Sequence, residues 1–375
     1  MVSNYPSDTG YAWWLMEHFW KTLANIFVQA GKKAYLAYPR ITTISETIAG
    51  SPIDTVALTI PWNNRDEAER VFSFIKTHNI SYIYFTDQPY LSLKYIKMRM
   101  HGVKRIINHD HTPGDRPPVT GIKGILKYIV NRIPWYTVDK VFCVSDLMKQ
   151  RNILNGRIPA RKSSVIQNGI TPINCPNKNH ATKRSLGINE STFLVITTGR
   201  AHPYKRFDFI IESARALLEG SPDLDIKFIL VGDGPAMPEL KSLVKKYHLE
   251  HHVLLLGFRG DIHRLLCDSN LAFHAALGEG FSLSITEYMS AGLPILVPDI
   301  PSVSQAIDNN INGYIYPFNQ IEYAAKKLKY LSENPDKARR MGKKAKEKAD
   351  TKYNIDSCTS AFEKAVKTIT EHNLI

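Results

Sequence analysis

Residues 191–220 read STFLVITTGRAHPYKRFDFIIESARALLEG, and this stretch decides the fold of the chain. Its first part, residues 192–198, is an unbroken run of apolar and β-branched side chains, which is typical of a strand buried on both faces. Gly199 ends the run, and the segment that follows Arg206 repeats apolar residues at helical spacing. A buried strand, a loop and an amphipathic helix together make one unit of a parallel α/β sheet.

The same alternation of strand and helix runs along most of the chain. Strands are predicted over residues 32–39, 81–87, 103–111, 139–145, 191–199, 225–235, 251–258, 270–277 and 293–299. Helices are predicted over residues 65–79, 206–220, 236–249 and 285–292. Two successive runs of such units predict an α/β protein with two doubly wound, Rossmann-like domains.

The boundary between the two domains is predicted in residues 167–190, which contain Asn, Gly and Pro and have no apolar period. The domains would then cover residues 1–170 and 171–355, and an amphipathic helix follows over residues 356–375. Only MVSNYP precedes the turn at residues 7–11, so the first strand is expected to be short.

The cysteines and the composition are those of a globular protein of the cytoplasm. The chain has 375 residues, of which 43% are hydrophobic and 22% charged. Its four cysteines are far apart and form no CxxC pair, which argues against a zinc site and a disulfide framework and favours a reducing compartment; they are Cys143, Cys175, Cys267 and Cys358. The first residues do not resemble a signal peptide, and no apolar run is long enough to span a membrane.

Positive charge is concentrated in the first half of the chain. Residues 1–170 hold 22 Lys and Arg against 12 Asp and Glu, within a net charge of +13 for the whole chain. Such an excess either only aids solubility or attracts an anionic partner, such as a lipid surface or a phosphorylated substrate. We find no basic-aromatic module, so nucleic acid is not expected as a partner.

Residues 121–136, GIKGILKYIVNRIPWY, predict a basic amphipathic helix. Helices of this kind either pack on a core with their lysines in solvent or lie in a membrane interface. Both interpretations stay open for this segment.

Basic and glycine-rich loops follow three of the predicted strands. Arg200 and Lys205 come after one strand and before a helix, which suits a diphosphate, although a solvated basic turn has the same pattern. Residues 232–235, Gly-Asp-Gly-Pro, either let a ligand approach the backbone or form an ordinary turn. Phe258, after Gly257, either flanks a base or caps its strand.

Residues 278–294, GEGFSLSITEYMSAGLP, place two carboxylates eight positions apart. We expect a helix to begin near Ser284, with Glu279 in the preceding loop and Glu287 in the first turn. The amides of residues 281–284 would then point at an anion over the helix N-terminus. A capping box from Ser284 to Glu287 would explain the second glutamate without any ligand.

Two histidines, His109 and His111, flank Asp110 at the end of a predicted strand. On a continuing strand they face the same side and either orient a substrate hydroxyl, shuttle a proton or serve the structure. A metal would need a third ligand, which is not evident. The sequence Asp-Leu-Asp at residues 223–225 precedes a strand, so it is interpreted as a turn.

Taken together, these motifs resemble glycosyltransferase family 4, whose members are retaining enzymes of the GT-B fold. The resemblance covers Gly199-Arg200 with Lys205, the segment 232–235 and the E-x7-E pattern of Glu279 and Glu287. It is specific over residues 190–320 and loose over the first ~140 residues. It implies that the two domains face each other across a cleft and that the final helix returns to the first domain.

The resemblance also implies a role for each matching residue. The catalytic set would be Glu279, Arg200, Lys205, His109 and His111. The nucleotide-sugar donor would contact Gly10, Arg200, Lys205, Gly232, Asp233, Phe258, Gly280, Phe281, Ser282, Leu283, Ser284 and Glu287. Two positions depart from the family pattern: Gly10 is followed by Tyr11 rather than a second glycine, and Ser282 stands where a glycine is usual.

The implied activity is transfer of a hexose, with retention, from a UDP- or GDP-sugar to a saccharide or lipid-linked saccharide, in surface polysaccharide or glycolipid synthesis. No metal or other cofactor is expected, and the chain would act in the cytoplasm or at the inner face of the membrane. The alternatives are a GT-B epimerase or phosphorylase and a non-catalytic protein that binds sugar nucleotides.

Overall fold

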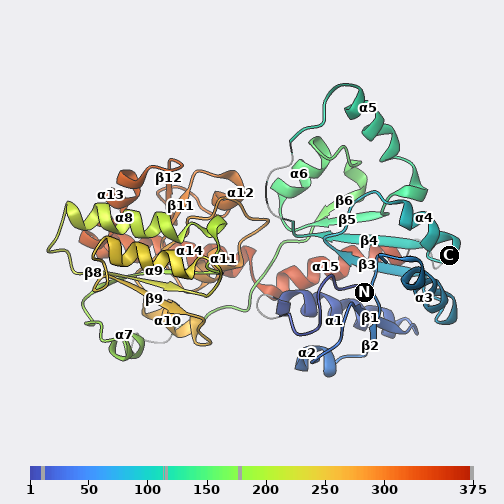
Figure 1. Cartoon of the computed structure of the whole chain (residues 1–375), viewed down its shortest axis with the longest axis horizontal. Coiled ribbons are helices and arrows are strands. Elements are labelled where there is room, and N and C mark those ends of the chain that lie inside the picture. The colour runs from blue at the N-terminus through green and yellow to red at the C-terminus, as the bar shows by residue number, and fades with distance from the viewer. Residues whose placement is uncertain (10–12, 113, 115–116, 176–179, 372–375) are drawn as a thin grey trace. The chain divides into compact units, whose positions relative to one another are not determined.

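The computed structural model describes residues 1–9, 13–112, 114, 117–175 and 180–371 (Figure 1). The chain divides into two compact units. Unit 1 comprises Met1–Asn168 together with Asp356–Ile375, and unit 2 comprises Gly169–Ile355.

Unit 1 is built on parallel strands. They are β1 (Ala34–Tyr38), β2 (Ile53–Ala57), β3 (Tyr82–Thr86), β4 (Arg105–Asp110), β5 (Lys140–Cys143) and β6 (Ser163–Val165). Strand β1 pairs with β2, and the order β3-β4-β5-β6 forms the second part of the sheet. The short first strand is confirmed, because within residues 1–9 it consists of Val2, which forms bridges to Ala37 of β1 and Phe85 of β3.

The helices of unit 1 follow the strands in alternation. They are α1 (Trp13–Gln29), α2 (Glu46–Ala49), α3 (Arg65–Thr77), α4 (Leu93–Met100), α5 (Gly121–Val130), α6 (Asp146–Leu154) and α15 (Ile355–Glu371). The last of these packs in unit 1 through Phe362, whose ring lies 4.9 Å from that of Phe19 and 5.7 Å from that of Phe142.

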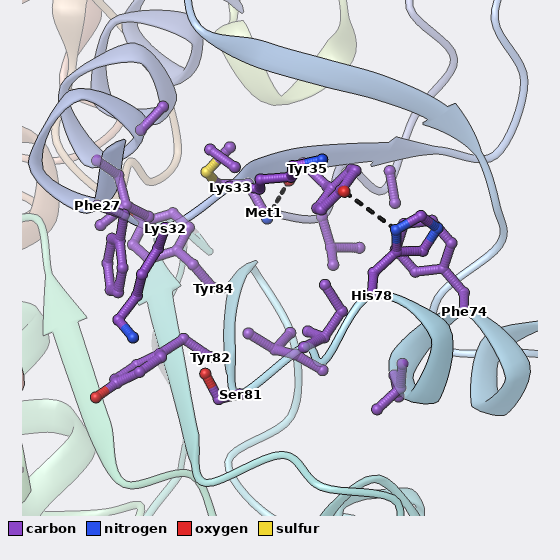
Figure 2. A pocket seen from close by; sticks show the side chains of 18 of the residues that line it. Met1, Phe27, Lys32, Lys33, Tyr35, Phe74, His78, Ser81, Tyr82 and Tyr84 are labelled. Atoms are coloured by element: carbon purple, nitrogen blue, oxygen red, sulfur yellow. Dashed lines mark hydrogen bonds between the residues drawn. The ribbon is translucent and has the colours of Figure 1, made fainter. Parts of the chain in front are cut away.

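A cavity of about 330 Å³ lies in unit 1 beside Met1 (Figure 2). Apolar and aromatic side chains of β1, β3, α1 and α3 line it, and the Met1 amine donates a hydrogen bond to the Tyr35 carbonyl oxygen at 2.7 Å. Burial lowers the pKa of this amine to about 5, so it is neutral at pH 7. The lining includes Lys33 and Ser81, which precede β1 and β3, so the cavity is at the amino ends of these strands and not where such sheets bind ligands.

Unit 2 contains a six-stranded parallel sheet of order β12-β11-β10-β7-β8-β9. Its strands are β7 (Phe193–Thr198), β8 (Ile226–Val231), β9 (Val253–Gly257), β10 (Leu271–Phe273), β11 (Ile295–Pro298) and β12 (Gly313–Tyr316). Its helices are α7 (Ala181–Ser185), α8 (Phe207–Glu219), α9 (Met237–Lys246), α10 (Ile262–Asp268), α11 (Leu283–Ser290), α12 (Pro301–Ser304), α13 (Ile321–Glu333) and α14 (Pro335–Lys352).

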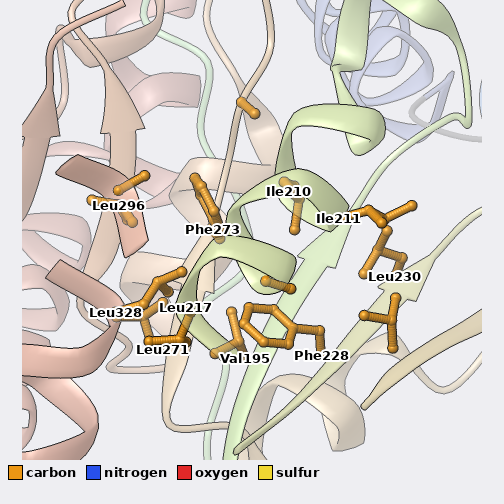
Figure 3. Close-up of a cluster of buried hydrophobic side chains, with 14 of the residues drawn as sticks. Val195, Ile210, Ile211, Leu217, Phe228, Leu230, Leu271, Phe273, Leu296 and Leu328 are labelled. Carbon is orange, nitrogen blue, oxygen red and sulfur yellow. The ribbon is translucent and has the colours of Figure 1, made fainter. Parts of the chain in front are cut away.

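Every residue of β7 is buried, as the unbroken apolar run predicts for a strand covered on both faces. Figure 3 shows strand residues Val195, Phe228 and Phe273 beside Ile210 of α8 and Leu328 of α13. The predicted α/β class with two Rossmann-like sheets is therefore confirmed.

Three strands of the structure are absent from the prediction, namely β2, β6 and β12. Strand β2 buries only its first residue, Ile53, so its sequence lacks the apolar run of an inner strand. Two of the three residues of β6 are serines and β12 begins with a glycine, so neither strand shows the apolar run of a buried strand.

The expectation that the cysteines form no disulfide is wrong. Cys175 and Cys267 are bonded to each other, with their Cα atoms 5.3 Å apart. They are separated by 92 positions, and only the folding of unit 2 brings α10 beside the segment that contains Cys175. Cys143 and Cys358 are buried free thiols.

Candidate active site

The candidate site lies at the carboxyl ends of the strands of unit 2. Strands β7 and β10 are neighbours, but the chain runs outward from them in opposite directions, through β8 and β9 on one side and β11 and β12 on the other. Such a reversal of strand order opens a crevice beside the strand ends, where open α/β sheets bind their ligands. The loop after β7 holds Lys205, and the loop after β10 holds Glu279.

Lys205 and Glu279 form an ion pair at this edge of the sheet. Lys205 Nζ lies 2.5 Å from Glu279 Oε1, and only 11% and 13% of the two side chains are exposed. Burial alone would raise the pKa of Glu279, but the hydrogen bond from His274 and the charge of Lys205 outweigh it and lower that pKa to about 2. The carboxylate is therefore charged at neutral pH, and it holds Lys205 in a fixed position.

His274 is a site residue that sequence reasoning missed. It directly follows β10, is 3% exposed, and its Nε2 lies 3.2 Å from Glu279 Oε1. Burial lowers the pKa of His274, so the neutral ring donates its Nε2 proton to the carboxylate. The available signal was a lone histidine in the apolar run LAFHAAL, five positions before Glu279.

The loop that contains Glu279 is held at both ends by hydrogen bonds. The Leu277 amide donates to the Tyr204 carbonyl oxygen at 2.8 Å, which joins this loop to the one with Lys205. Behind the glutamate, its own amide donates to Ser302 Oγ at 3.4 Å, and Gln305 Nε2 donates to the Gly280 carbonyl oxygen at 3.2 Å. The ion pair thus rests on two loops that are bonded to each other.

Helix α11 begins one residue earlier than the sequence suggested, because Ser282 is its N-cap and Leu283 its first residue. Ser282 Oγ accepts a hydrogen bond from the Ile285 amide at 3.4 Å, so the predicted capping box from Ser284 to Glu287 is wrong. The serine that replaces the usual glycine is 7% exposed and serves the helix. The amides of Leu283 and Ser284 lie in the first turn, where a helix offers them no partner of its own.

Glu287 is half-buried on α11 and stands in the second turn, not the first. Within the described part of the chain its carboxylate has no hydrogen bond or ion pair. Burial raises the pKa of Glu287 to about 7. A half-buried carboxylate without a partner is a ready acceptor for ligand hydroxyls.

Tyr288, the next residue, ties α11 to the end of β7. Its hydroxyl accepts a hydrogen bond from the Thr198 amide at 2.6 Å and donates to the Thr198 carbonyl oxygen at 3.2 Å. Thr198 directly precedes Gly199 and Arg200. Tyr288 therefore fixes the position of the loop with Arg200 and Lys205 relative to the N-terminus of α11.

The glycines after β7 and β8 serve the contact between their two loops. Gly232 has φ +139°, and a side chain there would collide with the Gly199 carbonyl oxygen. Gly234 likewise faces the Ala201 carbonyl oxygen. Asp233 is exposed, and its Oδ1 accepts the Gly234 amide at 2.7 Å. Of the two interpretations left open, the turn explains these glycines, since their near neighbours are backbone atoms of the facing loop.

Arg200 and Phe258 are two further exposed members of the predicted set. Arg200 follows Gly199 at the end of β7, and its side chain makes no hydrogen bond or ion pair among the described residues. The Phe258 ring is 77% exposed just beyond β9. Both side chains are thus available to a ligand.

The predicted histidines lie in unit 1, at the end of β4, with ring centroids 4.2 Å apart. His109 is 0% exposed, its Nδ1 is 2.5 Å from the Tyr84 hydroxyl, and its ring stacks on Phe362. Direct substrate contact by His109 is therefore wrong for this structure, because aromatic side chains cover it.

His111 is only partly buried, and its amide donates to Asp87 Oδ1 at 2.6 Å. Burial lowers the pKa of both histidines, so both rings are neutral at pH 7. Their Nε2 atoms have no hydrogen-bond partner among the residues that the structure describes. The remaining member of the predicted set, Gly10, lies outside the described residues.

Part of the chain matches a known family. Residues 178–348 match the model of the family Glycosyl transferases group 1. A relative from Escherichia coli, UDP-Gal:alpha-D-GlcNAc-diphosphoundecaprenol alpha-1,3-galactosyltransferase, is 30% identical over 188 residues, which are 49% of this chain and 46% of that protein. The chain spans about half the length of the curated relatives it matches.

Two solved structures resemble the whole chain in fold. A glycosyltransferase from Rickettsia africae ESF-5 has a TM-score of 0.79 at 18% identity and covers 98% of this chain and 97% of its own. Anabaena Alr3699/HepE in complex with UDP has a TM-score of 0.74 at 17% identity, and the match covers 96% of this chain and 97% of the HepE chain. The chain therefore has the GT-B fold of glycosyltransferases, and its second unit carries the sequence pattern of the group 1 glycosyl transferases.

Proposed function

We propose that this protein is a retaining glycosyltransferase that moves a hexose from a nucleotide-diphosphate sugar to a saccharide or lipid-linked saccharide. The observation that carries the proposal is the buried pair of Lys205 and Glu279 beside the N-terminus of α11. A fixed cation and first-turn amides suit a diphosphate, and carboxylates on either side suit hydroxyl groups. A sugar nucleotide has this sequence of groups.

In the proposed complex, Arg200 and Lys205 bind the diphosphate together with the amides at the start of α11. Glu287 accepts hydrogen bonds from the ribose hydroxyls, and Glu279 accepts them from the transferred sugar. Phe258 directly follows β9, which is separated from β7 by β8. Its exposed ring can stack on the base there.

The reaction follows from where the positive charge lies. The acceptor hydroxyl attacks the anomeric carbon on the face from which the diphosphate leaves, so the bond to the acceptor oxygen forms as the bond to the phosphate oxygen breaks. The hydroxyl proton passes to the departing diphosphate. Arg200, Lys205 and the α11 dipole stabilise the negative charge that develops on that group, which is electrostatic catalysis and needs no protein nucleophile.

The acceptor is proposed to be a saccharide or lipid-linked saccharide, as in the synthesis of surface polysaccharides or glycolipids. The E. coli relative is named for a diphosphoundecaprenol-linked acceptor and a UDP-sugar donor, and a HepE structure holds UDP-glucose. These names support UDP ahead of GDP for this chain.

The first experiment is calorimetry and thermal shift with UDP, GDP, ADP and their sugars, on the wild type and the Lys205→Ala variant. One nucleotide should raise the melting temperature of the wild type, and Lys205→Ala should weaken its binding at least tenfold, because a charge-assisted hydrogen bond is lost. The control is Lys241→Ala, which removes an exposed lysine of α9 and should bind as the wild type does.

Product analysis then tests the transfer itself. A new glycosidic bond with the anomeric configuration of the donor supports the proposal. Release of an epimerised sugar or a sugar phosphate would overturn it in favour of an epimerase or a phosphorylase. Equal binding by the wild type and Lys205→Ala would remove Lys205 from the site.

A further inference from the structure

Helix α5 of unit 1 carries its apolar side chains on the outside. Ile122, Ile125, Leu126 and Ile129 are exposed by 77%, 62%, 56% and 53%. They follow the i, i+3, i+4, i+7 spacing of one helix face. A helix that packs on a protein core turns such a face inward, so α5 shows the opposite arrangement.

The inward face of α5 is defined by two residues of a different kind. Gly124 is buried, and a side chain there would meet the Val119 carbonyl oxygen. Asn131 is 3% exposed, and its Nδ2 donates to the Gly156 carbonyl oxygen at 2.8 Å. Ile122 and Leu126 each stand two positions from Gly124, and two residues turn a helix by about 200°. The small face is therefore bonded to unit 1 and the isoleucine face points away from it.

Positive charge and aromatic rings surround this face. Residues 117–138 contain no Asp or Glu, and Lys123 and Arg132 are exposed. The Arg132 guanidinium lies 3.2 Å from the centre of the Tyr128 ring, and Trp135 is 56% exposed just beyond the helix. Basic side chains and amphipathic rings beside an apolar strip are the features of helices that lie in a membrane interface.

The size of the face argues against a second copy of the chain as its partner. A ten-residue helix is about 15 Å long, and its outward strip is far smaller than the ~800 Å² per partner that a stable protein interface buries. Cores of protein interfaces are also depleted in lysine. An anionic bilayer takes up a small apolar strip and attracts the lysine and arginine beside it. In Figure 1 the α5 ribbon stands apart from the strands of unit 1, as insertion requires.

We propose that α5 docks unit 1 on an anionic lipid surface, with Ile122, Ile125, Leu126 and Ile129 in the acyl region. Lys123 and Arg132 then contact lipid head groups. No helix of the described residues is long and apolar enough to cross a bilayer, so α5 lies on the surface. The inference does not depend on the proposed transfer reaction.

The test is flotation of the purified protein with vesicles of phosphatidylcholine alone or mixed with phosphatidylglycerol. The wild type should float with the mixed vesicles, and less as salt is raised. Ile125→Ser and Ile129→Ser should each weaken binding about tenfold, because one isoleucine fewer is transferred from water to the acyl region. Lys123→Ala should weaken it about fivefold on mixed vesicles and leave neutral vesicles unaffected.

Ile311→Ser is the matched control, since Ile311 is 57% exposed in unit 2 and lies outside α5. All these residues are exposed, so each variant should keep the melting temperature of the wild type. Failure of the wild type to float, or equal flotation of Ile125→Ser, overturns the proposal. Light scattering that shows a dimer in the wild type and a monomer in Ile125→Ser overturns it too, because the occupant is then a second copy.

Discussion

At the scale of single residues, the charged carboxylate of Glu287 lowers the stability of the folded protein. Its pKa of about 7 in the folded protein is above the ordinary value of 4.5. The folded state therefore holds the proton more tightly than the unfolded state, and the free energy of unfolding falls as pH rises from about 4.5 to about 7. Above that range the loss is complete.

Glu287→Gln should therefore stabilise the ligand-free protein by about 1–3 kcal/mol at pH 8 and leave its stability nearly unchanged at pH 4.5. If the proposed complex is right, the same variant should bind the nucleotide sugar at least tenfold more weakly, because the ribose hydroxyls lose a charged acceptor. Urea titrations at the two pH values and calorimetry measure the two effects. Glu250→Gln, at an exposed position, is the control, and a variant that is no more stable at pH 8 would contradict the assigned burial.

The sequence places some site residues well and others poorly. Lys205 and Glu279 follow predicted strands, and parallel strands bring their carboxyl ends to one edge, so their proximity is predictable. The hydrogen bond of His274 to Glu279 is not, because a histidine in an apolar run has no distinguishing spacing. Ser282 is the N-cap instead of Ser284, because both serines suit that position in the sequence and only the path of the preceding loop distinguishes them.

At the scale of elements, the loops after β7 and β8 touch backbone to backbone. Gly232→Ala should destabilise unit 2 by about 2–4 kcal/mol, because the new methyl group meets the Gly199 carbonyl oxygen in a conformation that side chains rarely adopt. Gly260→Ala is the matched control, since a side chain there has nothing within 4 Å. Urea unfolding compares the two, and equal midpoints would show that the loops are not in contact in solution.

Prediction of elements succeeds where burial is continuous and fails where it is partial. Strand β7 is evident because every one of its residues is buried, and helix α8 because each of its turns buries apolar side chains. Strand β2 is not, since four of its five residues are partly or fully exposed. The amphipathic period of α5 was evident, but which of its faces points outward depends on Asn131 and Gly156, which no local pattern reveals.

At the scale of the whole molecule, the disulfide and the tryptophans lie in different units. Cys175 and Cys267 belong to unit 2, and all five tryptophans belong to unit 1; they are Trp13, Trp14, Trp20, Trp62 and Trp135. Opening a loop of this length removes a constraint on the unfolded chain, typically about 2–4 kcal/mol. Dithiothreitol should therefore lower the urea midpoint seen by circular dichroism more than the midpoint seen by tryptophan fluorescence.

The Cys175→Ser, Cys267→Ser double variant is the control for this prediction, because its unfolding should not respond to the reductant. Equal shifts of the two signals in the wild type would mean that both units unfold in one transition. A wild type that does not respond at all would show that the two thiols are not bonded in solution.

The contact between the loops after β7 and β8 also has a consequence for inheritance. A side chain at Gly232 or Gly234 would collide with the backbone of the facing loop, at Gly199 and Ala201. Such a mutation should therefore persist only where the facing loop has first moved away. The two loops are therefore expected to change together among descendants of this sequence, as a single character. Changes in ligand preference at the carboxyl ends of these strands are then expected at positions that have room for new side chains. Phe258, whose ring is in solvent, is the clearest of these positions.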